Sequence, residues 1–291
     1  PAVSTSIAAF AGSFNKGPLD EIVSISSEQE LVETFGKPDS SNFEYFFSAA
    51  NFLQYSNSLR VVRATQTSAV NASTSGTGVL IKNTDDWTNN YASGGSAGNA
   101  DFVAREAGTD GNNLLVSVCP NATAYEQNAV TTLNDSSTSV GDTTVTVTSG
   151  TGINVGDILS FSTTAATNDY DDGEQYRVTG VSTNDITIVQ HPRGTGGLKR
   201  ALTDGCNIRR RWRYYDSVDG APGTSQYVSD RNGSGDELHV VVADEDGEWT
   251  GNKNQVLEVF ENLSVASDAK NEDGTVNFYK EVLNQRSAYI F

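Results

Sequence analysis

The sequence contains no methionine, two cysteines and two histidines among its 291 residues. Cys119 and Cys206 are far apart in the chain, whereas a domain held together by disulfides usually shows more cysteines at closer spacing. We therefore expect two reduced, buried thiols. A zinc site needs cysteine and histidine ligands at short spacing, and neither cysteine has such a neighbour in the sequence. We predict no metal site and no bound cofactor.

The scarcity of histidine also argues against an enzyme, because histidine is the base that most often activates a nucleophile. His191 lies in a segment with proline and glycine, and His239 lies inside the apolar segment LHVVV. We expect a surface loop residue and a buried, hydrogen-bonded residue, respectively. No Gly-x-Ser-x-Gly motif occurs, and the glycines at 193–200 lack the Lys-Ser or Lys-Thr of a phosphate-binding loop. The prediction is that the chain is not an enzyme.

Basic residues are scarce as well. The chain has 19 lysines and arginines against 37 aspartates and glutamates, and its net charge is −18. Phosphate contacts need lysine and arginine, so we expect no direct binding to nucleic acid. An acidic membrane surface is an equally poor partner, and no apolar run approaches the roughly 20 residues that span a bilayer. Residues 214–291 carry 15 acidic and five basic residues, so much of the acidity lies near the C-terminal end.

The strongest pattern in the chain is FFSAANFLQYSNSLRVVRA, residues 46–64. Apolar residues at helical spacing predict a helix over about 42–55, with its Phe46, Phe47 and Leu53 buried. This stretch holds no cysteine, histidine or acidic residue, so it carries no chemistry of its own. Its pattern points to packing.

The segments around this stretch predict a compact α/β region. Residues 59–64 are apolar except for two arginines and predict a central strand. Ser27 and Glu30 form a capping box that starts a short helix, and Gly36 ends it. Residues 67–100 are rich in Ser, Thr, Asn and Gly, and we expect a long loop with one strand there.

Residues 129–200 have a different character. The segments TTVTVTSG, GDILSF, QYRVTGV and DITIVQ are short apolar stretches separated by glycine and aspartate, and they predict a small sandwich or barrel. The tripeptide Val-Gly-Asp occurs twice, at 140–142 and 155–157. Within 201–291, ELHVVVAD predicts a buried strand, NQVLEVFENLSV a strand or a short helix, TVNFYKEVLNQRS a helix and AYIF a final strand.

These patterns together predict the fold class α/β, or α+β, in two parts. Residues 1–128 and 201–291 are expected to form one discontinuous domain, and residues 129–200 an all-β module inserted on its surface.

Four of the 19 basic residues lie in RRRWR, residues 209–213. Nucleic-acid binding, a solvated strand face and contact with an acidic patch on another copy are all open at this point. Side chains alternate along a strand, so one face would carry Arg209, Arg211 and Arg213. We predict that this face meets an acidic patch on a neighbouring copy, because guanidinium groups pair with carboxylates bidentately. The densest candidate patch comprises Asp244, Glu245 and Asp246.

Three stretches carry a resemblance to a known family. The first, AAFAGSF to LRVVRA at 8–64, has a Gly-Pro turn, a strand, a capped helix ending in Phe-Gly-x-Pro, a second helix and a Leu-Arg-Val-Val-Arg strand, in that order. The second is FVAREAGTDGNNLLVSV, and the third runs from DELHVVVADEDGEW to SAYIF. They resemble the tail sheath protein of contractile-tailed, myovirus-type phages, and the module at 129–200 lies outside the resemblance.

The resemblance implies a structural virion protein located in the phage tail and assembled in the host cytoplasm. Many copies would stack as hexameric rings around the tail tube protein, with baseplate and tail terminator proteins as further partners. Contraction of this sheath would drive the tube through the host envelope. Sheath proteins usually carry an N-terminal arm and a large C-terminal domain beyond the segments matched here, so we expect a partial chain.

One alternative function stays open. The module at 129–200 could belong to a virion adhesion or carbohydrate-binding protein, and its Tyr170 and Tyr176 would then line a binding groove.

Overall fold

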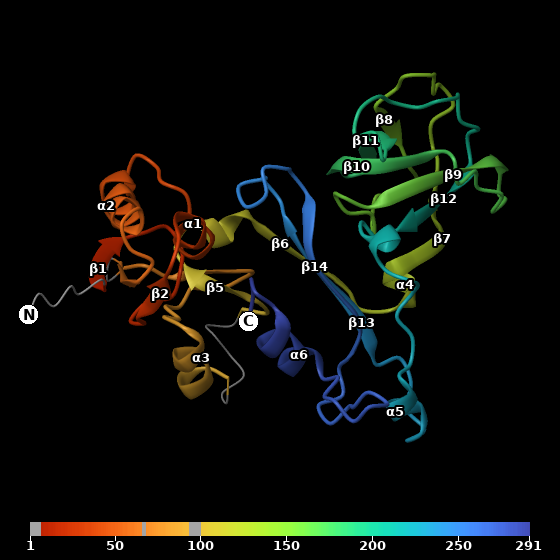
Figure 1. The fold of residues 1–291 in the computed structure, drawn as a ribbon. Helices are drawn as coiled ribbons and strands as arrows, with labels where there is room; N and C mark the ends of the chain where they lie inside the picture. Colours follow the sequence, from red (N-terminus) through yellow and green to blue (C-terminus); the bar gives the residue numbers. More distant parts are fainter. Residues whose placement is uncertain (1–6, 66–67, 93–99) are drawn as a thin grey trace, which may run out of the picture. The chain divides into compact units, whose positions relative to one another are not determined.

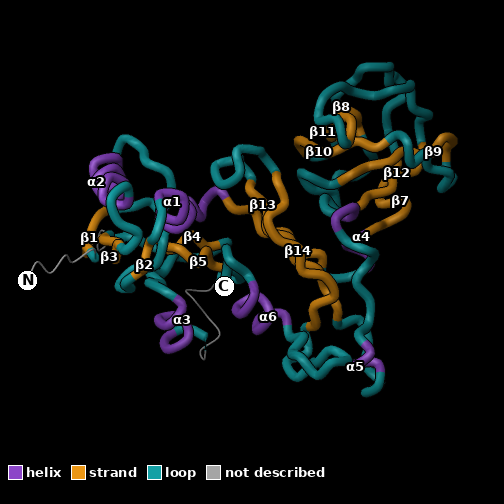
Figure 2. The backbone as a smooth tube through the Cα atoms, viewed as in Figure 1, coloured by secondary structure: helices purple, strands orange, loops and turns teal. Residues whose placement is uncertain are grey.

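The computed structural model describes residues 7–65, 68–92 and 100–291. Helices and strands are mixed along the chain, as Figures 1 and 2 show. The chain divides into two compact units, of which the first comprises 1–117, 241–258 and 279–291, and the second 118–240 and 259–278. Within the described ranges, no helix has both the length and the apolar character needed to cross a membrane.

The first unit begins with a three-stranded sheet in the order β1-β3-β2. Its strands are β1 (Ala8–Ser13), β2 (Val23–Ile25) and β3 (Leu59–Ala64). Strand β3 lies in the centre, parallel to β1 and antiparallel to β2, as its apolar sequence predicts. Helices α1 (Glu28–Phe35) and α2 (Phe43–Leu53) connect β2 to β3. Side chains of both helices form one core with Ile25, Leu59 and Val61 of the sheet.

Helix α1 starts and ends where its sequence signals lie. The Ser27 hydroxyl accepts a hydrogen bond from the Glu30 amide at 3.2 Å. The Glu30 carboxylate reaches back to the Ser26 amide at 2.8 Å, one residue beyond the partner expected in a capping box. Gly36 ends the helix with φ at 89°, and its amide donates to the Val32 carbonyl. Only glycine adopts this backbone without strain.

Helix α2 buries a narrower face than the sequence predicts. Phe46, Ala49 and Ala50 are buried, and Leu53 packs against the same core. The prediction that Phe47 is buried is wrong, because 49% of this residue is exposed. Consecutive helical residues lie about 100° apart, so a helix that centres Phe46 on the sheet turns Phe47 toward solvent. The Phe47 ring lies perpendicular to the Phe46 ring, with 5.6 Å between their centroids.

The rest of the first unit contains a helix that the sequence did not predict. Strands β4 (Asn71–Ser73) and β5 (Val103–Ala107) pair, and α3 (Thr84–Asn90) lies between them in sequence, inside the predicted loop. Asn83 caps α3 by accepting the Asp86 amide at 2.9 Å. Residue 67 and residues 93–99 of that predicted loop lie outside the described residues.

The last residues do not form the predicted strand. They follow helix α6 (Tyr279–Arg286), and Ile290 forms a single antiparallel bridge with Ala104 of β5. The Phe291 ring stacks between two side chains instead. Its centroid lies 4.4 Å from the Trp87 ring and 4.2 Å from the Arg105 guanidinium carbon.

The second unit contains a six-stranded sheet in the order β7-β12-β9-β10-β11-β8. Its strands are β7 (Glu126–Thr132), β8 (Thr144–Thr146), β9 (Ile158–Ala165), β10 (Gln175–Ser182), β11 (Asp185–His191) and β12 (Cys206–Arg211). Just beyond the ends of β7 and β8, Leu133 bridges to Val147, and this contact joins the two outer strands. The sheet therefore closes into a small barrel with one apolar core. Closure leaves few unpaired strand edges.

The repeated Val-Gly-Asp tripeptide makes the same turn twice, once before β8 and once before β9. Asp142 accepts the Ser139 amide at 2.7 Å, and Asp157 accepts the Asn154 amide at 2.8 Å. The glycines have φ of 95° and 99°, and the valines ahead of them are exposed. The repeated tripeptide therefore forms a turn that precedes a strand in both places.

The remaining strands are β6 (Leu114–Cys119), β13 (Glu237–Asp244) and β14 (Gln255–Ser264), in the order β14-β13-β6. Strand β13 is buried as predicted. The segment of β14 was predicted to be either a strand or a short helix, and it forms a strand. Short helices are η1 (Asp110–Asn113), α4 (Ala122–Tyr125), η2 (Tyr215–Ser217) and α5 (Gln226–Ser229). The barrel includes β7 and β12, so it extends on both sides of 129–200. The predicted discontinuous domain with an inserted module stays a prediction.

Candidate functional site

The first two predicted interface arginines lie on β12 and are bonded within the second unit. Arg209 is 8% exposed, and its guanidinium pairs with the Asp172 carboxylate and lies over the Tyr170 ring at 4.6 Å. Arg211 pairs with the same carboxylate at 3.2 Å and with Glu126 at 2.5 Å. Both side chains share one face, as strand alternation requires. Hydrogen bonding to Arg209 lowers the pKa of Asp172.

Arg210 points to the other face of β12. Its guanidinium donates to the Thr123 carbonyl at 2.7 Å and to the Ala124 carbonyl at 3.1 Å. The Asp157 carboxylate lies 3.9 Å away, and burial raises the pKa of Asp157 to about 6. These contacts join helix α4 to the turn before β9 within the second unit.

Arg213, the third predicted arginine, follows the end of β12 and is half-buried. Its guanidinium carbon lies 5.4 Å from the centre of the Tyr214 ring. Its aliphatic part packs so closely on Gly156 that a side chain there would meet it at 2.8 Å.

The predicted acidic residues belong to the first unit and differ in exposure. Asp244 is fully buried and accepts the amides of Gly247, Trp249 and Thr250. It organises the turn after β13 and is held within the subunit. Glu245 and Asp246 are exposed, and the Lys253 ammonium lies 4.0 Å from Asp246.

The structure thus places Arg209 and Arg211 on one face, but carboxylates of the same subunit neutralise much of their charge. Asp172 and Glu126 of the same copy pair with Arg209 and Arg211, for which the sequence predicted carboxylates of a neighbouring copy. Arg211, Arg213, Glu245 and Asp246 keep exposed or half-buried side chains. The predicted contact between copies stays a prediction and rests on these four residues.

Arg63 is a structural centre that sequence reasoning missed. It is 4% exposed and lies on the helix-covered side of the sheet. Its guanidinium donates to the carbonyls of four residues at 2.7–2.9 Å, namely Phe14, Asn15, Gly17 and Ala107. It thereby ties the loop after β1 to the end of β5. The signal was present in the sequence, as an arginine at an inward-facing position of an apolar strand.

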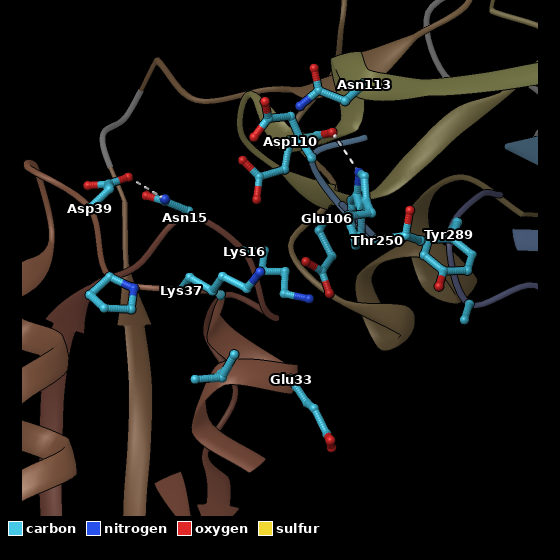
Figure 3. A pocket seen from close by; sticks show the side chains of 16 residues that line it. Asn15, Lys16, Glu33, Lys37, Asp39, Glu106, Asp110, Asn113, Thr250 and Tyr289 are labelled. Atoms are coloured by element: carbon cyan, nitrogen blue, oxygen red, sulfur yellow. Dashed lines mark hydrogen bonds between the residues drawn. The ribbon is translucent and has the colours of Figure 1, made fainter. Parts of the chain in front are cut away.

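The loop held by Arg63 borders a pocket of about 840 Å³ in the first unit (Figure 3). Its charged residues are Lys16, Lys37, Glu33, Asp39, Glu106, Asp110 and Glu248. Burial raises the pKa of Glu106 and of Asp110. Hydrogen bonds from Ser41 and Asn15 lower the pKa of Asp39 to about 2.

This pocket has an aromatic wall as well as an acidic surplus. The Lys16 ammonium lies 4.9 Å from the centre of the Trp249 ring, and the Tyr289 ring meets Trp249 edge-on at 5.2 Å. The described lining contains no cysteine, histidine or serine, and its five carboxylates outnumber its two lysines.

Across 7–65, 68–92 and 100–291, no group of three or more His, Cys, Asp or Glu side chains is arranged to hold a metal ion. His239 is buried, with one ring nitrogen 2.9 Å from the Gly220 carbonyl and the other accepting the Asn262 amide at 3.0 Å. His191 ends strand β11 and does not lie in a loop, and burial lowers its pKa. Both cysteines are free and buried.

The groove required by the carbohydrate-binding alternative is not formed by the predicted residues. Tyr176 is fully buried in the barrel core, where its hydroxyl accepts the Lys199 amide at 2.9 Å. Tyr170 is half-buried beneath Arg209. Strand alternation directs Tyr176 inward, together with Val178 of the same strand.

Comparisons with known proteins identify one segment of the chain. Residues 5–64 match the family model described as tail sheath protein Gp18 domain III N-terminal region. The tail sheath protein of Enterobacteria phage T4 is 54% identical over 61 residues, which is 21% of this chain and 9% of that protein. The tail sheath protein of Vibrio phage KVP40 is 44% identical over 59 residues, 20% of this chain and 9% of that protein.

The solved structures that match include that of a sheath tail protein, at a low score. The crystal structure of the sheath tail protein Lin1278 from Listeria innocua has 12% identity and a TM-score of 0.26, covering 69% of this chain and 34% of that one. A score this low carries no argument about the fold. The sequence matches span less than a tenth of the length of the curated relatives. The resemblance to phage tail sheath proteins is confirmed for residues 5–64, about a fifth of the chain.

Proposed function

We propose that this chain is part of a contractile tail sheath subunit of a bacteriophage. The observation that carries the proposal is the match of residues 5–64, at 54% identity to one tail sheath protein. These residues include the sheet β1-β3-β2 and both helices packed on it, so the similarity covers a packed structural block. The role is structural and not enzymatic.

In the proposed assembly, copies of the subunit form hexameric rings that stack helically around the tail tube, between baseplate and tail terminator proteins. The assembly forms in the host cytoplasm and becomes part of the virion. The extended sheath is held by a kinetic barrier, and contraction moves subunits largely as rigid bodies to drive the tube through the host envelope. The energy comes from contacts between subunits.

Two finer assignments belong to the same proposal. Residues 1–128 and 201–291 form the sheath domain, and 129–200 is a module inserted in it. Arg211 and Arg213 of one copy face Glu245 and Asp246 of the next. Exposed ion pairs contribute only about 0–1 kcal/mol each, but a sheath repeats such a contact in every subunit.

Electron microscopy tests the proposed function directly. Gold-labelled antibodies raised against this chain should decorate phage tails along their length, and negatively stained preparations of the full-length protein should contain rings or hollow striated tubes. Labelling restricted to capsids or tail fibres, with a full-length protein that stays monomeric from low to physiological salt, would show that the function is another one.

A further inference from the structure

We propose that the uncovered face of the sheet β1-β3-β2 docks an acidic segment of a second copy of this chain. We call this surface the open face. It comprises Ala9, Ala11 and Ser13 of β1, Ser24 of β2, and Arg60, Val62 and Ala64 of β3. The inference rests on the proposed function, because both require that copies assemble.

The geometry of the sheet defines this face. Side chains alternate along each strand, so Leu59, Val61 and Ile25 face the helices while their neighbours face away. The strand register aligns Ala9, Arg60 and Ser24 in one row across the sheet. Helices α1 and α2 supply the core of the helix-covered side, and the open face is exposed apart from Val62, which is half-buried.

The chemistry of the open face is unusual for this chain. It carries no carboxylate, although the chain has 37 acidic residues against 19 basic ones. Its single charge is Arg60, which is exposed and forms no ion pair with any residue in the described ranges. Arg63, three residues later on the same strand, is bound by four carbonyl oxygens. Arg60 is therefore available to a partner.

The side chains around Arg60 leave room for a close approach. A strand face that stays in water usually carries larger residues, because alanine has low strand propensity and covers little of the backbone. Here the neighbours are mainly alanine and serine. Strand β1 is also the outer strand of this sheet, and its sequence AAFAGS has no charge or proline. Edge strands that must avoid other chains usually carry such residues.

Charge complementarity selects the occupant. A net charge of −18 opposes the packing of identical copies unless acidic groups of one copy meet a non-acidic surface of the next. The open face is such a surface, with one free guanidinium at its centre for a carboxylate. We therefore assign the face to an acidic segment of another copy, not to a small molecule.

Sedimentation velocity of the full chain over a salt series tests this assignment. Arg60→Glu should weaken self-association about tenfold at low ionic strength, since reversal replaces attraction by repulsion. Ala11→Gln, which adds bulk without charge, should weaken it at every salt concentration. Arg286→Glu is the matched control, because it makes the same charge change at an exposed residue at the end of α6, and it should have no effect.

The outcomes separate this inference from the proposed function. If the unmodified chain never self-associates and is absent from phage tails, the proposed function fails. If it assembles and Arg60→Glu and Ala11→Gln assemble equally well, only the open-face inference fails. Circular dichroism checks that both variants fold, and Arg60→Gln replaces any variant that does not.

Hydroxyl-radical footprinting provides an independent measurement. Assembly of this chain alone should protect residues 8–13 and 59–64 from oxidation. Protection that appears only when the tail tube protein is added would assign the face to the tube and overturn the second-copy assignment.

Discussion

Arginines three residues apart on strand β3 have opposite environments. Arg63 is 4% exposed and donates to four backbone carbonyls, whereas Arg60 is exposed on the other side of the sheet. Alternation along the strand places them on opposite faces. Both residues are arginines on the same strand, so their different roles follow from what covers each face of the sheet.

Arg63→Met should lower the free energy of unfolding by about 2–4 kcal/mol, because it removes four donors and leaves buried carbonyls unpaired. Arg60→Met is the control on the same strand, and its effect should stay within about 0.5 kcal/mol. Urea unfolding measures both. Equal effects would show that the Arg63 contacts do not stabilise the fold.

Phe46 and Phe47 offer a second matched pair. Phe46→Ala should cost about 3–5 kcal/mol, since Phe46 is 1% exposed and central to the core of the first unit. Phe47→Ala should cost less than about 1 kcal/mol, because its ring is half-exposed. Thermal and urea unfolding distinguish the two. A larger loss for Phe47 would contradict the helix orientation described here.

Asp157 should make the stability of the second unit depend on pH. Burial raises the pKa of its carboxyl from 3.8 to about 6 in the folded chain. As pH rises between these values, the unfolded chain loses the proton first, so folding becomes less favourable. The stabilisation is present below about pH 4 and is lost as pH passes 6, with a total change of about 2–3 kcal/mol.

Comparison with Asp157→Asn isolates this contribution. Urea unfolding at pH 4 and pH 7 should show a larger loss of stability with rising pH in the unmodified chain than in the variant. Trp212 is the tryptophan of the second unit and reports its unfolding once Trp87 and Trp249 are changed to phenylalanine. The same pH dependence in both proteins would rule out Asp157 as its source.

The turns formed by the repeated tripeptide allow a test at the level of one structural element. Gly141 and Gly156 both have positive φ, so alanine should strain either turn by about 1 kcal/mol. A side chain at 141 meets nothing within 4 Å, whereas at 156 it meets the Arg213 side chain at 2.8 Å. Gly156→Ala should therefore be the more destabilising variant, and thermal unfolding of the two proteins measures the difference. The reverse order would be inconsistent with the packing of Arg213 on this turn.

Several elements follow from local sequence because local forces decide them. The capping box, the glycine stop of α1, the central position of β3 and the four short strands of 129–200 all appear at the expected places. Helix α3 was missed because its polar sequence has little apolar periodicity, and its Asn83 cap lies in a segment that reads as loop. The predicted final strand is reduced to one bridge between Ile290 and Ala104, and the contacts of the Phe291 ring with Trp87 and Arg105 join segments far apart in the sequence.

For the chain as a whole, the proposed contact between copies can be tested by charge reversal. Arg211 and Arg213 changed together to Glu should weaken assembly at low salt and have less effect at high salt, because salt screens charges beyond roughly 8–10 Å. Adding Glu245→Lys and Asp246→Lys should restore assembly. Arg209 and Asp244 stay unchanged, since both are buried and bonded within one copy. Light scattering measures assembly, and an unchanged signal at low salt would refute the contact.

The sequence by itself determined the mixed fold class, the strands of the barrel, the ends of α1 and the similarity of residues 5–64 to tail sheath proteins. These features depend on residues close together in the chain. Only the tertiary structure decided that the sheet of the second unit closes at Leu133 and Val147, that Phe47 faces solvent and that Arg209 is buried beside Asp172. Burial and ion pairing depend on which distant segments meet, and a linear pattern of apolar and charged residues leaves that choice open.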